Sequence, residues 1–220
     1  MICQYHNMDE LENALTKNIV AILKESISTK NHAKILLSGG NTPKGLYHKL
    51  SLQDLQWSKI HVGLVDERFV EKNSQYSNEK MIREVLLQNK ASKANLTGMI
   101  FETDYKNNLD TAKTKYQYFL NSDVLLLGMG NDGHTASLFP NDESSQNACE
   151  DQKADLVNTN APVKPVQRIT LNKKFIYEAD NVFLMFNGQD KSLVFEKSVE
   201  NTCPIHHFIP KLNAVYYATK

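Results

Sequence analysis

Residues 33–50 read AKILLSGGNTPKGLYHKL, and this stretch sets the pattern on which the chain is built. Residues 33–37 are a short apolar run, which predicts a buried β-strand. The pair Gly39–Gly40 marks a tight loop, because glycine adopts backbone conformations that other residues avoid. Pro43 suits the first turn of a helix. The stretch therefore predicts a strand, a tight loop and a helix in direct succession.

The same pattern recurs along the chain. Further strands are predicted at residues 59–65, 123–127, 168–171, 181–186 and 214–218. Helices are predicted at residues 8–29, from Ser77, at 108–121 and at 190–199, with a helical turn at 173–178. The polar residues 141–165 contain two prolines, which favours a loop with at most one short strand at 156–157. The alternation predicts one α/β domain over residues 1–220, with an open, doubly wound (Rossmann-like), mainly parallel sheet and helices on both faces.

The composition limits the kinds of partner. Lys+Arg and Asp+Glu both number 25, so the formal net charge is zero. Nucleic acids and anionic membranes reward a basic surface, so neither is expected as the partner, whereas a small anion needs only a few local cations. The three cysteines are widely spaced and predict neither a disulfide framework nor a zinc site. The N-terminal residues lack the features of a secretory signal, which favours a cytoplasmic location.

Three loops with reactive side chains each follow a predicted strand. In doubly wound sheets the ligand binds beyond the carboxyl ends of the strands, so these loops are expected to converge. The first, residues 38–43 (SGGNTP), combines glycines, hydroxyl groups and a helix N-terminus, as a phosphate cradle would. A simple strand-to-helix turn is the alternative. The second, Asp66-Glu67-Arg68, can orient a polar substrate or bind an oxyanion. A solvated turn with a local ion pair is its alternative.

The third loop is GMGNDGHTASLFP, residues 128–140. Histidine titrates near neutral pH, so His134 is a candidate general base or acid. Asp132 can fix the tautomer of that imidazole or contact the substrate directly. A metal site would need further ligands at suitable spacing, and these are missing, so no metal is expected. The structural alternative is a capped turn whose polar side chains satisfy backbone groups.

The set of motifs SGGNTP, DERFV, SQYSNEKM and GMGNDGHTASLFP, between residues 38 and 140, resembles the 6-phosphogluconolactonase family. Weaker matches at RITL (168–171) and GQDK (188–191) extend the resemblance to residue 191. The resemblance implies hydrolysis of 6-phosphoglucono-1,5-lactone to 6-phosphogluconate in the oxidative pentose phosphate pathway. It also implies that the enzyme needs no cofactor, binds a small sugar phosphate, and is a monomer or weak homodimer.

The resemblance also implies roles for individual residues. His134 would activate the attacking water and later protonate the leaving ring oxygen, with support from Asp132. Arg68 would lie near the lactone, and the phosphate would rest on Gly39, Gly40 and Thr42 with Arg168 and Lys191 as its cations. The further substrate-binding candidates are Asn41, Asp66, Gly130 and Asn131.

Some positions depart from the family pattern, and two other functions remain open. Asn41 stands where serine is common and Glu71 where proline is usual, while residues 203–220 fit poorly. His206 and His207 are therefore taken as structural or surface residues. A glucosamine-6-phosphate deaminase/isomerase is the first alternative, although the third loop reads HTASLFP where that class has an HIAFNEP-like sequence. A non-catalytic sugar-phosphate sensor is the second, although His134 and Asp132 are both present.

Overall fold

The computed structural model describes residues 1–197 and 203–219, and its centre is a parallel sheet of seven strands in the order β1-β10-β9-β6-β2-β3-β5. The strands are β1 (Ile2–Tyr5), β2 (Ala33–Leu37), β3 (Ile60–Leu64), β5 (Asn95–Leu96), β6 (Val124–Leu127), β9 (Asn181–Asn187) and β10 (Ala214–Ala218). The predicted strand at 33–37 and the one at 214–218 are confirmed residue for residue. The mainly parallel α/β fold is therefore confirmed.

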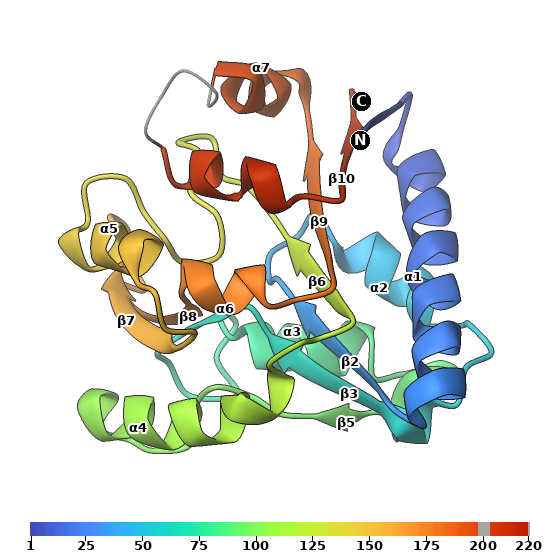
Figure 1. Cartoon of the computed structure of the whole chain (residues 1–220), viewed down its shortest axis with the longest axis horizontal. Helices are drawn as coiled ribbons and strands as arrows, with labels where there is room; N and C mark the ends of the chain where they lie inside the picture. Colours follow the sequence, from blue (N-terminus) through green and yellow to red (C-terminus); the bar gives the residue numbers. More distant parts are fainter. Residues whose placement is uncertain (198–202, 220) are drawn as a thin grey trace.

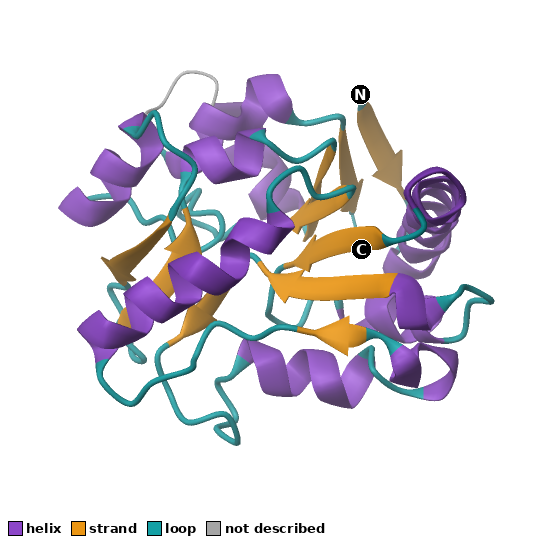
Figure 2. Cartoon of the chain, turned by 60° about the horizontal axis from the view of Figure 1, so that its bottom comes forward, coloured by secondary structure: helices purple, strands orange, loops and turns teal. Residues whose placement is uncertain are grey.

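Helices cover both faces of this sheet (Figures 1 and 2). They are α1 (Met8–Lys30), α2 (Lys44–Ser51), α3 (Asn78–Val85), α4 (Tyr105–Tyr116), α5 (Glu143–Glu150), α6 (Lys173–Tyr177) and α7 (Gln189–Lys197), with 3₁₀ helices η1 (Trp57–Lys59), η2 (Asn89–Lys93), η3 (Gln117–Phe119) and η4 (Pro204–Lys211). The crossovers through α1, α2 and α3 advance the chain toward β5, and those through α4, α6 and η4 return it toward β1. Right-handed crossovers in opposite directions place the two groups of helices on opposite faces.

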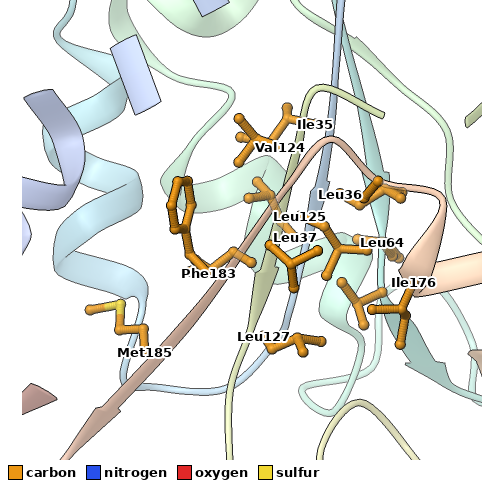
Figure 3. Close-up of a cluster of buried hydrophobic side chains, with 14 of the residues drawn as sticks. Ile35, Leu36, Leu37, Leu64, Val124, Leu125, Leu127, Ile176, Phe183 and Met185 are labelled. Atoms are coloured by element: carbon orange, nitrogen blue, oxygen red, sulfur yellow. The ribbon is translucent and has the colours of Figure 1, made fainter. Parts of the chain in front are cut away.

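The winding direction reverses between β2 and β6, which are hydrogen-bonded neighbours. Apart from the half-buried Lys34, both strands are buried and apolar, as expected for strands covered on both faces. Figure 3 shows the side chains of Ile35, Leu37, Val124 and Leu127 packed together in the resulting core. A crevice outside the carboxyl ends of such a strand pair is the usual ligand site of a doubly wound sheet.

A second, antiparallel sheet of three strands stands beside the first (Figure 2). Its order is β4 (Asp66–Arg68), β8 (Gln167–Leu171) and β7 (Leu156–Asn160). The expectation that residues 66–68 form a loop is therefore wrong. They form a short strand because their backbone pairs with β8, although three consecutive charged residues have low β-propensity.

The short strand expected at residues 156–157 is confirmed, but the expectation of a loop over the rest of 141–165 is wrong. Helix α5 occupies Glu143–Glu150 and β7 extends from Leu156 to Asn160. The helix begins because the Asp142 side chain accepts a hydrogen bond from the backbone N–H of Ser145. It was hidden in the sequence because its buried face is small and includes Ala148 and Cys149 rather than large aliphatic residues.

Other boundaries differ by less. Helix α4 begins three residues before the predicted 108, because Asp104 caps it, and ends at Tyr116 in favour of η3. Helix α7 is described up to Lys197, so the last two residues of the predicted helix at 190–199 lie outside the described residues. Strand β1 and helix η4 were not predicted. Neither carries a long apolar run, and His206 and His207 lie within η4.

Candidate active site

A cavity of about 260 Å³ opens at the carboxyl ends of β2 and β6. All three loops selected from the sequence contribute to its wall. Its lining comprises residues 38–43, Asp66, Arg68, Asn78, Leu126, Leu127, Gly128, Met129, Gly130, His134, Ala136, Met185 and Lys191. The predicted convergence of the loops is therefore observed, at the point where the winding direction of the sheet reverses.

The first loop leaves a helix N-terminus open toward the cavity. Gly40 has φ +92°, a conformation that favours glycine, and a Cβ at Gly39 would lie 1.8 Å from the Asn78 side chain. The residue before α2 is Pro43, whose side chain makes no capping hydrogen bond, whereas α1, α3, α4, α5 and α6 are each capped by a side chain. Free N–H groups at a helix N-terminus attract anions.

Strand β4 presents two polar side chains to the cavity. Asp66 is buried, and one carboxylate oxygen accepts a hydrogen bond of 2.5 Å from the Ser137 hydroxyl. Arg68 donates from Nη1 to the Tyr76 carbonyl at 2.7 Å, while its buried Nε has no protein partner among the described residues. Because Asp66 and Arg68 are two residues apart on a strand, they face the same side.

Glu67 lies between these two residues and points to the opposite side. Its carboxylate accepts three hydrogen bonds from the backbone N–H groups of Arg68, Asn78 and Glu79, at 2.7–2.8 Å, and one from the Ser77 hydroxyl. Burial raises the pKa of Glu67 to about 7, although the N–H groups act in the opposite direction. This carboxylate joins β4 to the start of α3 and so fixes the strand that carries Arg68.

The third loop holds an imidazole and a carboxylate in direct contact. His134 Nδ1 lies 2.6 Å from Asp132 Oδ1, and the same oxygen accepts the backbone N–H of His134 at 3.2 Å. The hydrogen bond from His134 is the main reason that the pKa of Asp132 lies below its ordinary value. Since an ionised carboxylate can only accept, Nδ1 carries the proton and Nε2 keeps a free lone pair. This arrangement suits a general base.

The backbone of this loop is held by hydrogen bonds within the loop and by others from the C-terminal part of the chain. The Gly130 N–H donates to the His134 carbonyl at 2.9 Å, and the Thr135 hydroxyl donates to the Gly128 carbonyl at 2.8 Å. From the C-terminal part of the chain, Lys191 donates to the Met129 carbonyl and the Ile205 N–H donates to the Gly133 carbonyl. The atypical residues after 203 thus support the loop that carries His134.

Nine of the twelve residues selected from the sequence line the cavity: Gly39, Gly40, Asn41, Thr42, Asp66, Arg68, Gly130, His134 and Lys191. Asn131, Asp132 and Arg168 do not. Asp132 reaches the cavity through its bond to His134. Arg168 is buried, donates from Nε to the Pro165 carbonyl at 2.9 Å, and lies over the Phe139 ring.

Arg168 nevertheless has an electrostatic relation to the site. It is the register partner of Arg68 in the small sheet, so two guanidinium groups share one face. Burial, followed by the neighbouring Arg68, lowers the pKa of Arg168. The nearby carboxylates of Asp66 and Glu67 act in the opposite direction and offset part of the repulsion between the two guanidinium groups.

Three lining or supporting residues were not found by sequence reasoning. Asn78 fills the space beside Gly39 and donates to the Asp66 carbonyl at 2.9 Å. Ser137 bonds to Asp66, and Ala136 precedes it with φ +52°, a left-handed conformation that is uncommon outside glycine. Asn78 lies inside the motif SQYSNEKM, and Ala136 and Ser137 lie inside the third motif, but their contacts could not be inferred from spacing.

A doubly wound α/β protein with a histidine–aspartate pair beside a glycine-rich loop at a helix N-terminus is the class that fold and site define. The family described as glucosamine-6-phosphate isomerases/6-phosphogluconolactonase matches residues 6–216. The chain belongs to this family, which confirms the resemblance noted in the sequence.

Individual relatives agree with the family match. A protein of Helicobacter pylori strain J99 named 6-phosphogluconolactonase is 32% identical over 204 residues, covering 91% of this chain and 87% of that protein. A 6-phosphogluconolactonase of Neisseria meningitidis serogroup A is 33% identical over 201 residues, covering 90% of this chain and 87% of that protein. The crystal structure of a 6-phosphogluconolactonase from Shewanella baltica superposes with a TM-score of 0.93 at 33% identity, covering 100% of this chain and 97% of that one.

Within residues 1–197 and 203–219, no three His, Cys, Asp or Glu side chains are grouped as metal ligands. Among the same residues, no helix has the length and apolar character required to cross a membrane.

Proposed function

We propose that this chain hydrolyses 6-phospho-D-glucono-1,5-lactone to 6-phospho-D-gluconate, the lactonase step of the oxidative pentose phosphate pathway. The observation that carries the proposal is the contact of 2.6 Å between Asp132 and His134, where His134 lines a cavity whose wall also contains Arg68 and Lys191. A general base and cations around one small cavity fit an anionic substrate with an electrophilic carbonyl. The names of the relatives support the same reaction.

The free Nε2 of His134 is assigned the role of general base. It takes a proton from water as the water oxygen attacks the lactone carbonyl carbon. The carbonyl oxygen becomes an oxyanion, for which the guanidinium group of Arg68 in the cavity wall is a suitable donor. When the C–O bond to the ring oxygen breaks, the protonated His134 returns its proton to that oxygen. The products are a hydroxyl group and a carboxylic acid, which then ionises.

The phosphate is assigned to the first loop. Gly39, Gly40, Asn41 and Thr42 bring backbone and hydroxyl donors to the uncapped start of α2, and Lys191 supplies the cation in the wall. Arg168 contributes positive charge from behind the wall. Asp66, Gly130 and Asn131 complete the proposed substrate contacts. Binding the remote phosphate helps to hold the lactone ring for attack.

The cavity is formed within one chain, which is compatible with a monomer or weak homodimer as the working form. The three cysteines are unpaired, as is usual in the reducing cytoplasm, where we place the activity. Size-exclusion chromatography with light scattering would test the first statement. Fractionation of the source cells would test the second.

A coupled assay tests the function directly. Glucose-6-phosphate dehydrogenase generates the lactone, and its loss is followed with and without this protein. We expect clear acceleration over spontaneous hydrolysis, and its loss in His134→Ala. The matched control is His6→Ala, since His6 is exposed and lies outside the cavity wall. If the protein fails to accelerate lactone loss but releases ammonia from glucosamine 6-phosphate, the deaminase alternative replaces this proposal.

A further inference from the structure

The side chain of Lys191 extends from the first turn of α7 to the backbone of the third loop. Its ammonium donates a hydrogen bond of 2.6 Å to the Met129 carbonyl oxygen. Lys191 is half-buried and lines the cavity, so the same ammonium faces both the loop and the space for the substrate. In Figure 1, α7 lies beyond the end of β9, on the side of the molecule where the third loop emerges from β6.

The peptide unit that accepts this bond also holds His134. The Met129 carbonyl and the Gly130 N–H belong to one planar peptide, and the N–H donates to the His134 carbonyl at 2.9 Å. The Cα of Gly130 lies close to the imidazole, since a Cβ built there would be 2.2 Å from His134 Cε1 and Nδ1. A rotation of this peptide must therefore move His134. Only the planar Met129–Gly130 peptide therefore separates the Lys191 ammonium from the residue proposed as the base.

The ammonium has donors to spare. It carries three N–H groups, of which the Met129 carbonyl uses one. No other hydrogen-bond partner of Lys191 is found in the described part of the chain, residues 1–197 and 203–219. A phosphate group entering the cavity can take the remaining donors without breaking the bond to Met129. It would then hold the ammonium in place from the other side.

We propose that Lys191 is a positioning residue that couples occupancy of the phosphate subsite to the placement of His134, through the Met129–Gly130 peptide. The proposal rests on the proposed function, since it concerns the same substrate. It separates two uses of the phosphate. One is affinity, which lowers KM. The other is alignment of the base, which raises kcat and requires binding energy to be used in the transition state.

A substrate cut into two pieces distinguishes these uses. D-glucono-1,5-lactone without the phosphate leaves the subsite empty, and phosphite dianion supplied separately can fill it. If Lys191 aligns His134, saturating phosphite is expected to raise kcat/KM for the unphosphorylated lactone about tenfold or more, because binding at a remote subsite then improves the chemical step. If the phosphate supplies affinity alone, phosphite leaves this rate unchanged or lowers it by competition.

The variant that tests the residue is Lys191→Met, which keeps the length of the side chain and removes its donors. The matched control is Lys197→Met, at the exposed end of the same helix. We expect phosphite activation to persist in Lys197→Met and to fall below about twofold in Lys191→Met. Circular dichroism and the thermal unfolding midpoint establish that both variants are folded.

A second readout does not depend on turnover. The NMR signals of the His134 imidazole are expected to shift when phosphite is added to the wild type and to Lys197→Met, and to stay in place in Lys191→Met. Absence of phosphite activation in the wild type, or activation that survives in Lys191→Met, overturns the coupling. If 6-phosphogluconolactone itself is not hydrolysed, the proposed function is wrong. The NMR signals of His134 then decide by themselves whether Lys191 couples the phosphate subsite to His134.

Discussion

Gly130→Ala is predicted to damage catalysis while leaving the fold intact. The added Cβ would lie 2.2 Å from His134 Cε1 and Nδ1, and 2.7 Å from Asp132 Oδ1. The backbone of Gly130 has no positive φ, unlike Gly40, Gly133 and Gly188, so alanine can adopt its conformation. The added methyl group therefore pushes against the side chains of His134 and Asp132, which are partly exposed and can move away.

The magnitude follows from the size of that movement. Carbon atoms in ordinary contact are separated by about 3.5 Å, so the imidazole must retreat by roughly 1.3 Å. A misplacement of about 1 Å can cost on the order of 100-fold in rate, which corresponds to about 2.7 kcal/mol in the activation free energy. We therefore expect kcat to fall about 100-fold, with a thermal unfolding midpoint within a few degrees of the wild type.

The assay is the coupled lactone assay, with kcat and KM determined separately. Gly128→Ala is the matched control, because it adds the same methyl group in the same loop and meets no atom within 4 Å. Because Gly128 itself lines the cavity, its added methyl group can also affect KM, so His6→Ala, outside the cavity wall, serves as the kcat control: its kcat should stay within about threefold of the wild type and the NMR signals of His134 should not move. A folded Gly130→Ala protein with wild-type kcat would refute the reasoning, as would equal losses of kcat in Gly130→Ala and Gly128→Ala.

The other predictions concern two carboxylates. Asp132→Asn is expected to lower kcat about 100-fold, because the amide can turn its NH₂ group toward Nδ1 and select the wrong tautomer of His134. Steady-state kinetics at neutral pH test this prediction. A loss in kcat of less than about threefold would contradict it. The folded-state pKa of Asp132 lies below its ordinary value of 3.8, so its contribution to stability is present above about pH 4 and lost as the pH falls. The difference in unfolding free energy between wild type and Asp132→Asn should accordingly shrink from pH 5 to pH 3 in urea titrations. Glu67→Gln at pH 8 should lower the unfolding free energy by about 1–3 kcal/mol, since an NH₂ group would then face backbone N–H donors; an unchanged urea midpoint would be evidence against that role.

The core of the fold could be predicted because the apolar runs in its central strands can be buried in few other ways. Residues 33–37 and 124–127 are almost entirely apolar, and a parallel strand covered on both faces is the structure that buries such runs. Residues 66–68, in contrast, are all charged, and their sequence does not indicate a strand. Their alternating contacts, Asp66 and Arg68 toward the cavity and Glu67 toward α3, are those of a strand, but only the partner strand β8 reveals this.

The site could be predicted as a set of loops and not as a set of contacts. The position of His134 two residues after Asp132 gave a candidate pair, and a turn closed by Gly130 and Gly133 realises it. The bonds from Ser137 to Asp66 and from Lys191 to Met129 join residues 71 and 62 positions apart. No local pattern encodes such contacts, because they depend on how separate strands are packed.

The pairing of the first strand with the last has a consequence for the order in which the chain can fold during synthesis. Strand β1 lies parallel to β10, and α1 packs against β10, β2 and β6. A ribosome delivers the buried side of α1, which includes Leu11 and Leu15, long before it delivers β10. The apolar side of α1 therefore stays partly exposed until β10 has been synthesised, because contacts between distant parts of a chain form late. The third loop is completed equally late, because the Ile205 N–H that binds the Gly133 carbonyl is made long after residues 128–140, so catalytic competence is expected to arise only after residue 205 has been synthesised.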